Sequence, residues 1–174
     1  MAEGIALAAS IIAVIQISDR IIGLTKHYIE TIHDAPRDFH VIRIEASTLK
    51  AVFESLKLLR DSGYALSNNL QKLGERDGPV EGCRRSVSEL EKLLEPPPQP
   101  TSNGKWRKVQ ESLRSLMWPL KKNQAKKLLD EISRYKTTIT LSLSTEQAYV
   151  FSFLIFFLLQ PLLLRRILTR SFQT

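Results

Sequence analysis

An uncharged run at the N-terminus constrains the fold of this chain more than any other feature. From Gly4 to Ser18 there are fifteen residues without a charge, and the first charges after them are Asp19 and Arg20. Apolar residues then recur at spacings of three and four as far as Ile32. The pattern predicts one helix over residues 2–32, apolar nearly all round at its start and one-sided at its end.

Such a helix belongs either in the core of a bundle or in a membrane. A secretory signal is disfavoured because it begins with basic residues, whereas the only early charge here is Glu3. A constitutive transmembrane helix needs about 20 predominantly apolar residues, and Asp19 comes slightly too soon. We expect a buried central helix. The alternative is a helix that is buried at rest and competent to enter a membrane when released.

The rest of the chain shows helical periodicity in successive segments. Helices are expected over residues 36–61, 79–95 and 121–144, with a short helix at 65–73 and an amphipathic segment from Lys105 that Trp118-Pro119 interrupts. Residues 138–144 alternate like a strand but have no partner strand, so a helix is favoured. The predicted fold is all-α, a bundle of four to five helices followed by a hydrophobic tail. Its expected core includes Ile12, Ile15, Ile22, Leu49, Phe53, Leu56, Val87, Leu90, Leu128 and Ile132.

Residues that carry catalysis or hold cofactors are sparse. The three histidines lack metal-ligand spacing, and no glycine-rich phosphate loop occurs. The single cysteine, Cys83, falls on the apolar stripe of the 79–95 helix, which indicates a small buried hydrophobe in a reducing compartment. We therefore expect a protein that is not an enzyme and that uses no cofactor, metal or small-molecule substrate.

Positive charge is concentrated in one segment. Residues 105–127 hold eight basic residues and only Glu111, a net +7 that equals the charge of the whole chain. The eight are Lys105, Arg107, Lys108, Arg114, Lys121, Lys122, Lys126 and Lys127. A solvated helix face or a surface for anionic lipid would explain them, while nucleic acid is disfavoured because no recognition motif is present. Trp106 and Trp118 suit either a membrane interface or a bundle core.

Several segments occur in the order of a known family. They are the opening eighteen residues, Asp34-Ala35-Pro36, Gly78-Pro79, Leu116-Met-Trp-Pro-Leu-Lys-Lys and Leu128-Leu-Asp-Glu-Ile-Ser-Arg-Tyr-Lys. Together they resemble the HeLo-like N-terminal domain of fungal STAND, or NLR-like, receptors, whose NACHT or P-loop NTPase domain follows it. The resemblance covers about residues 1–146, and its specificity lies in the ordered set because each segment consists of helix-packing residues.

The resemblance implies a non-catalytic signalling or cell-death effector. Such a module would self-associate or bind a homotypic helical domain, and it would act on membranes through its first helix. For this chain, the resemblance implies that the basic segment is the anionic-lipid patch. It also implies a membrane-inserting face made of Ile5, Leu7, Ile11, Ile12 and Ile15.

The chain departs from the family after Gln147. Residues 147–164 carry no charge, which predicts a transmembrane segment at about 148–168. We therefore divide the chain into a domain at 1–146 and a tail at 147–174. The tail is either a translated intron or a real anchor, which would add one transmembrane helix to a protein otherwise expected in the cytoplasm. A tail-anchored protein of unrelated role and a passive helical adaptor without lipid activity are the alternative functions.

Overall fold

The computed structural model describes residues 2–31, 37–62, 72–95, 118, 121–149 and 151–152. Its helices are α1 (Ala2–Thr31), α2 (Arg37–Asp61), α4 (Pro79–Leu94) and a helix over 121–149, and the described ranges contain no strand. The expected all-α bundle with a long apolar first helix is confirmed. Residues 138–144 are helical, as expected. The expected helix at 65–73 lies mostly outside the described residues, and the segment at 105–117 and the tail from 153 lie wholly outside them.

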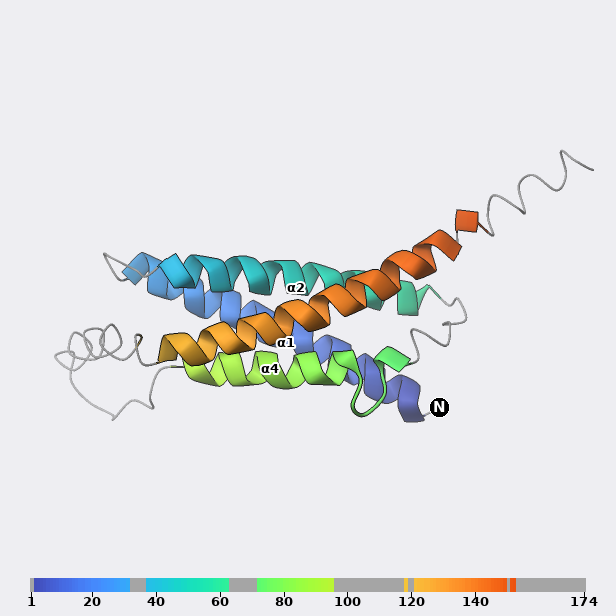
Figure 1. Cartoon of the computed structure of the whole chain (residues 1–174), viewed down its shortest axis with the longest axis horizontal. Coiled ribbons are helices and arrows are strands. Elements are labelled where there is room, and N and C mark those ends of the chain that lie inside the picture. The colour runs from blue at the N-terminus through green and yellow to red at the C-terminus, as the bar shows by residue number, and fades with distance from the viewer. Residues whose placement is uncertain are drawn as a thin grey trace, which may run out of the picture.

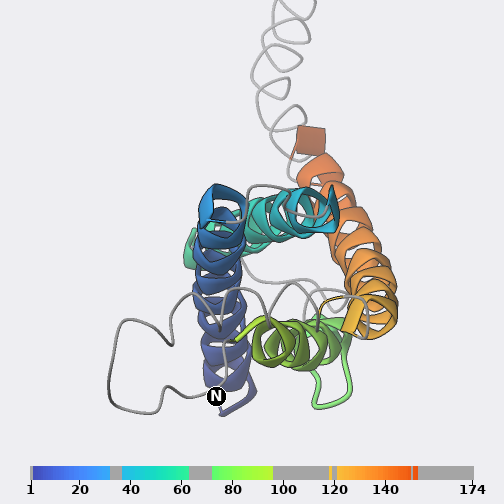
Figure 2. The same cartoon turned by 90° about the vertical axis from the view of Figure 1, so that its left-hand side faces the viewer.

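The four helices form a bundle in which α1 and the 121–149 helix lie along opposite sides (Figure 2). α2 and α4 lie between these two sides, and each contacts both α1 and the 121–149 helix. The Lys50 ammonium lies 2.7 Å from Asp19 across α1 and α2, and Ser86 donates a 2.9 Å hydrogen bond to Glu131 across α4 and the 121–149 helix. α1 and α4 begin at the same end of the bundle, where α2 and the 121–149 helix end (Figure 1).

The core follows the apolar periodicity of α2 and α4. Phe53 and Cys83 are fully buried, each at 0% exposure. Most of the expected core residues are buried: Leu49, Phe53, Leu56, Val87, Leu90, Leu128 and Ile132. Burying each of these larger apolar side chains contributes about 1.5–3 kcal/mol. Ile15 and Ile22 are half-buried against the core rather than inside it.

The prediction that Ile12 is buried is wrong, because its side chain is 40% exposed. The buried stripe of α1 runs instead through Leu7, Ile11, Val14, Ile17, Ile21 and Tyr28. The uncharged run is apolar nearly all round, so its periodicity did not mark which side faces water. The polar Ser18 is fully buried in the same stripe, while the apolar Ile5 is 72% exposed.

A glycine sets the spacing between α4 and the 121–149 helix. Gly82 lies so close to the ring of Tyr135 that a β-carbon there would be 2.6 Å from the ring Cζ atom. α4 itself begins after the extended Gly78, with Pro79 in the first turn, where its missing N–H is not needed. The two helices therefore approach closely near the end of the bundle at which α1 begins.

Candidate functional site

The membrane-inserting face expected on α1 is divided by the structure. Leu7 and Ile11 point into the core, at 6% and 0% exposure, whereas Ile5 and Ile12 lie on the opposite, solvent-facing side. Ile15 lies between the two sides and is half-buried. The five residues thus surround the helix rather than sharing one face, and only Ile5 and Ile12 are exposed while the bundle is closed.

α1 alone among the described helices is long and apolar enough to cross a membrane, over Ile5–Glu30. The central helix of a soluble bundle meets the same criterion, so length and composition do not choose between the two. The uncharged part, Gly4–Ser18, is about 22 Å long at 1.5 Å per residue, against about 30 Å of bilayer hydrocarbon. By itself it would reach about three-quarters of the way across.

Polar contacts hold α1 in the bundle mainly through its second half. The Arg20 guanidinium forms an ion pair with Glu91 of α4, and Asp19 pairs with Lys50 of α2. The hydroxyl of Tyr28 donates a 2.6 Å hydrogen bond to the carbonyl oxygen of Leu94. Sequence analysis missed these partners because each pair joins segments far apart in the chain. The available signal was the sudden arrival of charge at residues 19 and 20 of an apolar helix.

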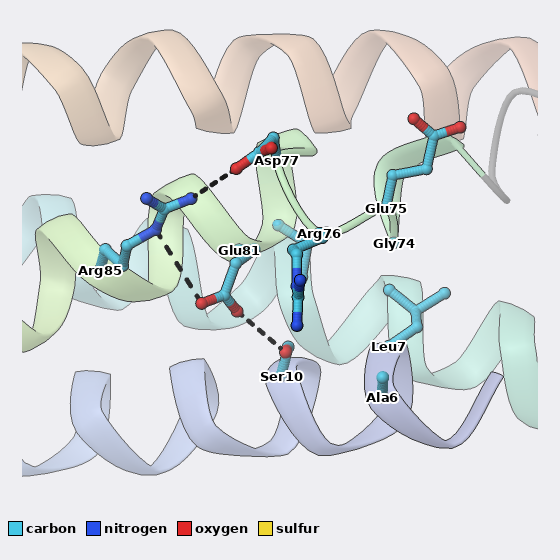
Figure 3. Close-up of a pocket in the computed structure, with 10 residues that line it drawn as sticks. Ala6, Leu7, Ser10, Gly74, Glu75, Arg76, Asp77, Glu81 and Arg85 are labelled. Atoms are coloured by element: carbon cyan, nitrogen blue, oxygen red, sulfur yellow. Dashed lines mark hydrogen bonds and ion pairs between the residues drawn. The ribbon is translucent and has the colours of Figure 1, made fainter. Parts of the chain in front are cut away.

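The first half of α1 borders an open groove of about 640 Å³ (Figure 3). The groove lies between α1, the turn at 74–78 and the start of α4, and it contains charged side chains that pair with one another. Glu81 accepts hydrogen bonds from Arg84, at 2.8 and 2.6 Å, and from the Ser10 hydroxyl at 3.3 Å. Arg85 lies 3.4 Å from Asp77. The hydrogen bonds from Arg84 hold the pKa of Glu81 below its usual range.

The described residues that line this groove bring together no nucleophile and base of the kind that catalysis uses. The groove-lining Ser10 donates to a carboxylate that Arg84 already keeps ionised. On the opposite side of the groove, Gly74 permits close packing, because a β-carbon there would lie 3.0 Å from that of Leu7. We interpret the groove as the junction at which the start of α1 packs on the bundle.

The described members of the basic segment differ in what they contact. Lys121 donates a 2.7 Å hydrogen bond to the carbonyl oxygen of Leu93, and the Lys122 ammonium lies 3.1 Å from Asp38. Lys126 and Lys127 are exposed. The other four basic residues lie outside the described residues: Lys105, Arg107, Lys108 and Arg114. Among the described members, Lys126 and Lys127 are therefore the better placed to meet a lipid phosphate.

These lysines lie at the start of the 121–149 helix, at the end of the bundle opposite to the start of α1 (Figure 1). The close approach of Gly82 to Tyr135 and the Ser10–Glu81 contact place Ile5 near the level of residue 141. Fifteen helical residues separate that level from Lys126, which corresponds to about 22 Å. The lysines and the apolar start of α1 could therefore not meet one flat membrane with the bundle standing on end.

Trp118 belongs to the core and not to a membrane-facing surface. Its side chain is 6% exposed, and its indole N–H donates a 3.2 Å hydrogen bond to Asp38. The ring lies 4.3 Å from that of Phe39, which in turn stacks 5.0 Å from Tyr28. This aromatic cluster closes the end of the bundle where α1 ends, and Trp106 lies outside the described residues.

Cys83 has the environment expected of a structural residue. Its side chain is fully buried, and burial raises the pKa of its thiol to about 12. Reactive cysteines show the opposite, a lowered pKa and access to solvent. Within the described ranges, no cluster of three or more histidine, cysteine or acidic side chains could hold a metal ion.

Comparisons of the chain with protein-family models, with curated proteins and with solved structures give no match. The resemblance to the fungal receptor domain therefore stays a prediction, and function has to be inferred from the chemistry of the helices.

Proposed function

We propose that this chain is a non-catalytic signalling or cell-death effector module of the fungal NLR-like type. In this proposal α1 is stored in the bundle and acts on a membrane after release, and copies of the module assemble with one another. The observation that carries the proposal is the division of α1. Its uncharged half packs by apolar contact and one serine hydrogen bond, while its second half carries the ion pairs.

This division supports release of one half of α1 rather than of the whole helix. Apolar side chains that leave the bundle would lose burial in protein but regain it in lipid, so the free-energy difference between the two states is small. The charged residues Asp19 and Arg20 would instead lose their partners and would resist entry into hydrocarbon. Residues 4–18 are therefore the part that we expect to insert, with residues 19–31 remaining on the bundle.

Ile12 allows a sharper test of insertion than Ile11. Because Ile11 is buried at 0% exposure, Ile11→Asp should also destabilise the bundle. Ile12 is 40% exposed, so Ile12→Asp places a charge within the uncharged run while leaving the core intact. The expected result is an unchanged circular dichroism spectrum, retained binding to anionic vesicles and loss of dye release from them.

The matched control is Thr137→Asp, which introduces the same charge at an exposed position of the 121–149 helix. It should leave dye release unchanged. If Ile12→Asp releases dye as well as the unmodified chain does, insertion of α1 is wrong. If the unmodified chain neither binds nor permeabilises anionic vesicles, the passive adaptor replaces the effector as the better function.

Localisation and cell viability address the tail and the effector role together. The full chain and a chain ending at residue 146 would be expressed as fluorescent fusions. Toxicity of both forms supports the effector domain, whereas membrane localisation of the full chain alone, without toxicity, supports a tail-anchored protein of unrelated role.

A further inference from the structure

α2 presents an uncharged stripe on the side opposite to the core. Its members are exposed and follow one another at spacings of three and four: Val41, Ile44, Thr48, Ala51, Ser55 and Leu58. The apolar side chains at its two ends are well exposed, Ile44 at 59% and Leu58 at 72%. Alternating spacings of three and four along one side of a helix are the pattern of a helix–helix seam.

The outer sides of the other described helices carry charged residues over at least part of their length. On α1, the outer side carries Asp19, Lys26 and Glu30 after its first turns. The 121–149 helix exposes Lys126, Lys127, Asp130 and Arg134 along its first half and only uncharged residues from 137 to 149, and α4 exposes Arg85, Glu89 and Lys92. The stripe of α2 is thus uncharged over about 26 Å of helix, from residue 41 to residue 58.

The hydroxyl groups of the stripe already have hydrogen-bond partners within the chain. The Ser55 hydroxyl donates to the carbonyl oxygen of Ala51 at 3.0 Å, and the Thr48 hydroxyl donates to that of Glu45 at 3.0 Å. The Thr48 oxygen also accepts a 3.1 Å hydrogen bond from the ammonium of Lys136 on the 121–149 helix, which pairs with the Glu45 carboxylate. A hydroxyl that is already bonded to its own helix can be covered by a partner at low desolvation cost. Small residues at the middle of the stripe would also allow a second helix to approach closely.

We infer that this outer stripe of α2 is the surface through which two copies of the chain associate, antiparallel about a two-fold axis at Ala51. The order of side-chain sizes supports this arrangement. With Ala51 opposite Ala51 of the second copy, Ile44 meets Leu58 and Thr48 meets Ser55, so large pairs with large and small with small. An isologous contact requires such self-complementarity.

The charges beside the stripe favour the same orientation. Arg37 lies at its N-terminal end and Asp61 lies at its C-terminal end, where Asp61 also pairs with Arg60 of its own chain. Antiparallel pairing brings Arg37 of one copy toward Asp61 of the other, whereas parallel pairing would place Arg37 beside Arg37. The contact is small beside a typical stable interface, so we expect a weak dimer whose population rises with concentration. The inference rests on the homotypic assembly in the proposed function and names its surface.

Disulfide cross-linking of the full chain tests the two-fold axis. Ala51→Cys should cross-link to itself about tenfold faster than Thr137→Cys, because a formed contact raises the effective thiol concentration. The native Cys83 is buried and contributes little background. In an equimolar mixture of Ile44→Cys and Leu58→Cys chains, the mixed disulfide should exceed the sum of the two self-linked products, which random pairing would only equal. Preferential self-linking of Ile44→Cys would overturn the antiparallel arrangement.

Ala51→Glu should abolish the concentration-dependent dimer in analytical ultracentrifugation, and Thr137→Glu should not. A chain that stays monomeric at every concentration and links Ala51→Cys no faster than Thr137→Cys overturns the inference. The inference is also overturned if the thiol of Ala51→Cys is protected from a small thiol reagent in the monomer. Another segment of the same chain would then cover the stripe.

Vesicle assays separate failure of this surface from failure of the proposed function. If the dimer behaves as expected while the unmodified chain ignores anionic vesicles, the association surface stands and the membrane role fails. If Ala51→Glu leaves the oligomeric state unchanged while dye release persists, the membrane role stands and the surface is wrong.

Discussion

At the scale of single residues, replacing two glycines on neighbouring helices by alanine should change the stability in opposite directions. Gly23 lies in the middle of α1, and a β-carbon there would meet no atom within 4 Å. Gly23→Ala should therefore raise the free energy of unfolding by about 0.5–1 kcal/mol, since alanine loses less conformational entropy on folding. Gly82→Ala must displace the ring of Tyr135 and should therefore lower the free energy of unfolding. Urea unfolding curves measure both, and equal stabilisation by the two would contradict the close approach at Gly82.

Cys83 predicts a pH dependence at the same scale. Burial raises the pKa of its thiol from 9.0 to about 12, so the folded state holds the proton more tightly than the unfolded chain does. Its contribution to stability is complete below about pH 9 and is lost as pH rises toward 12. Cys83→Ala should flatten this part of the stability profile. At neutral pH the native thiol should react with a thiol reagent only as fast as the domain opens, and rapid labelling would contradict its burial.

At the scale of elements, the sequence was sufficient to predict the helices and part of the core. Leu49 and Phe53 could be assigned to the interior because charged residues on the flanks of α2 mark which side is apolar. On α1 no charge marks the outside before Asp19, so the choice between Ile11 and Ile12 depended on packing. Trp118 was likewise undecided until its contacts with Asp38 and Phe39 were known.

The partners of α1 were beyond prediction for a related reason. Arg20 and Glu91 are separated by 71 positions in the chain, and no local pattern brings them together. The outer stripe of α2 could have been found from its spacing. Its short polar residues, such as Ser55, are instead typical of an ordinary solvated helix face.

The ion pair between α1 and α4 leads to a prediction about release. Glu91 is buried while the Arg20 side chain is 60% exposed, so we expect this ion pair to contribute more than a fully exposed pair and less than a fully buried one. Glu91→Gln should lower the free energy of unfolding by about 1–2 kcal/mol and increase dye release from vesicles. The control is Lys26→Gln, whose pair with Glu30 joins two exposed side chains 3.9 Å apart within α1. It should change stability by less than about 0.5 kcal/mol. Equal effects of the two substitutions would contradict a role for the α1–α4 pair in holding the helix.

At the scale of the whole molecule, recruitment and insertion have to use different ends of the bundle. Lys126 and Lys127 lie near one end, and the apolar start of α1 lies at the other (Figure 1). If both act on one bilayer, the bundle lies along the membrane or the first half of α1 swings away from it. Lys121 and Lys122 contact Leu93 and Asp38, so reversing their charge would disturb packing as well as lipid binding.

The test of recruitment therefore changes only Lys126 and Lys127, both to Glu. Each lysine near an anionic surface contributes about 1 kcal/mol, and salt screens that contribution beyond about 10 Å at 0.1 M. The double variant should keep its circular dichroism spectrum and bind anionic vesicles at least about tenfold more weakly at low salt. The difference from the unmodified chain should shrink as salt is added. Lys57→Glu with Lys72→Glu changes net charge equally at exposed positions near the end of α2 and before the start of α4, and it should weaken binding less. Equal losses would show that overall charge, rather than this surface, attracts the chain to lipid.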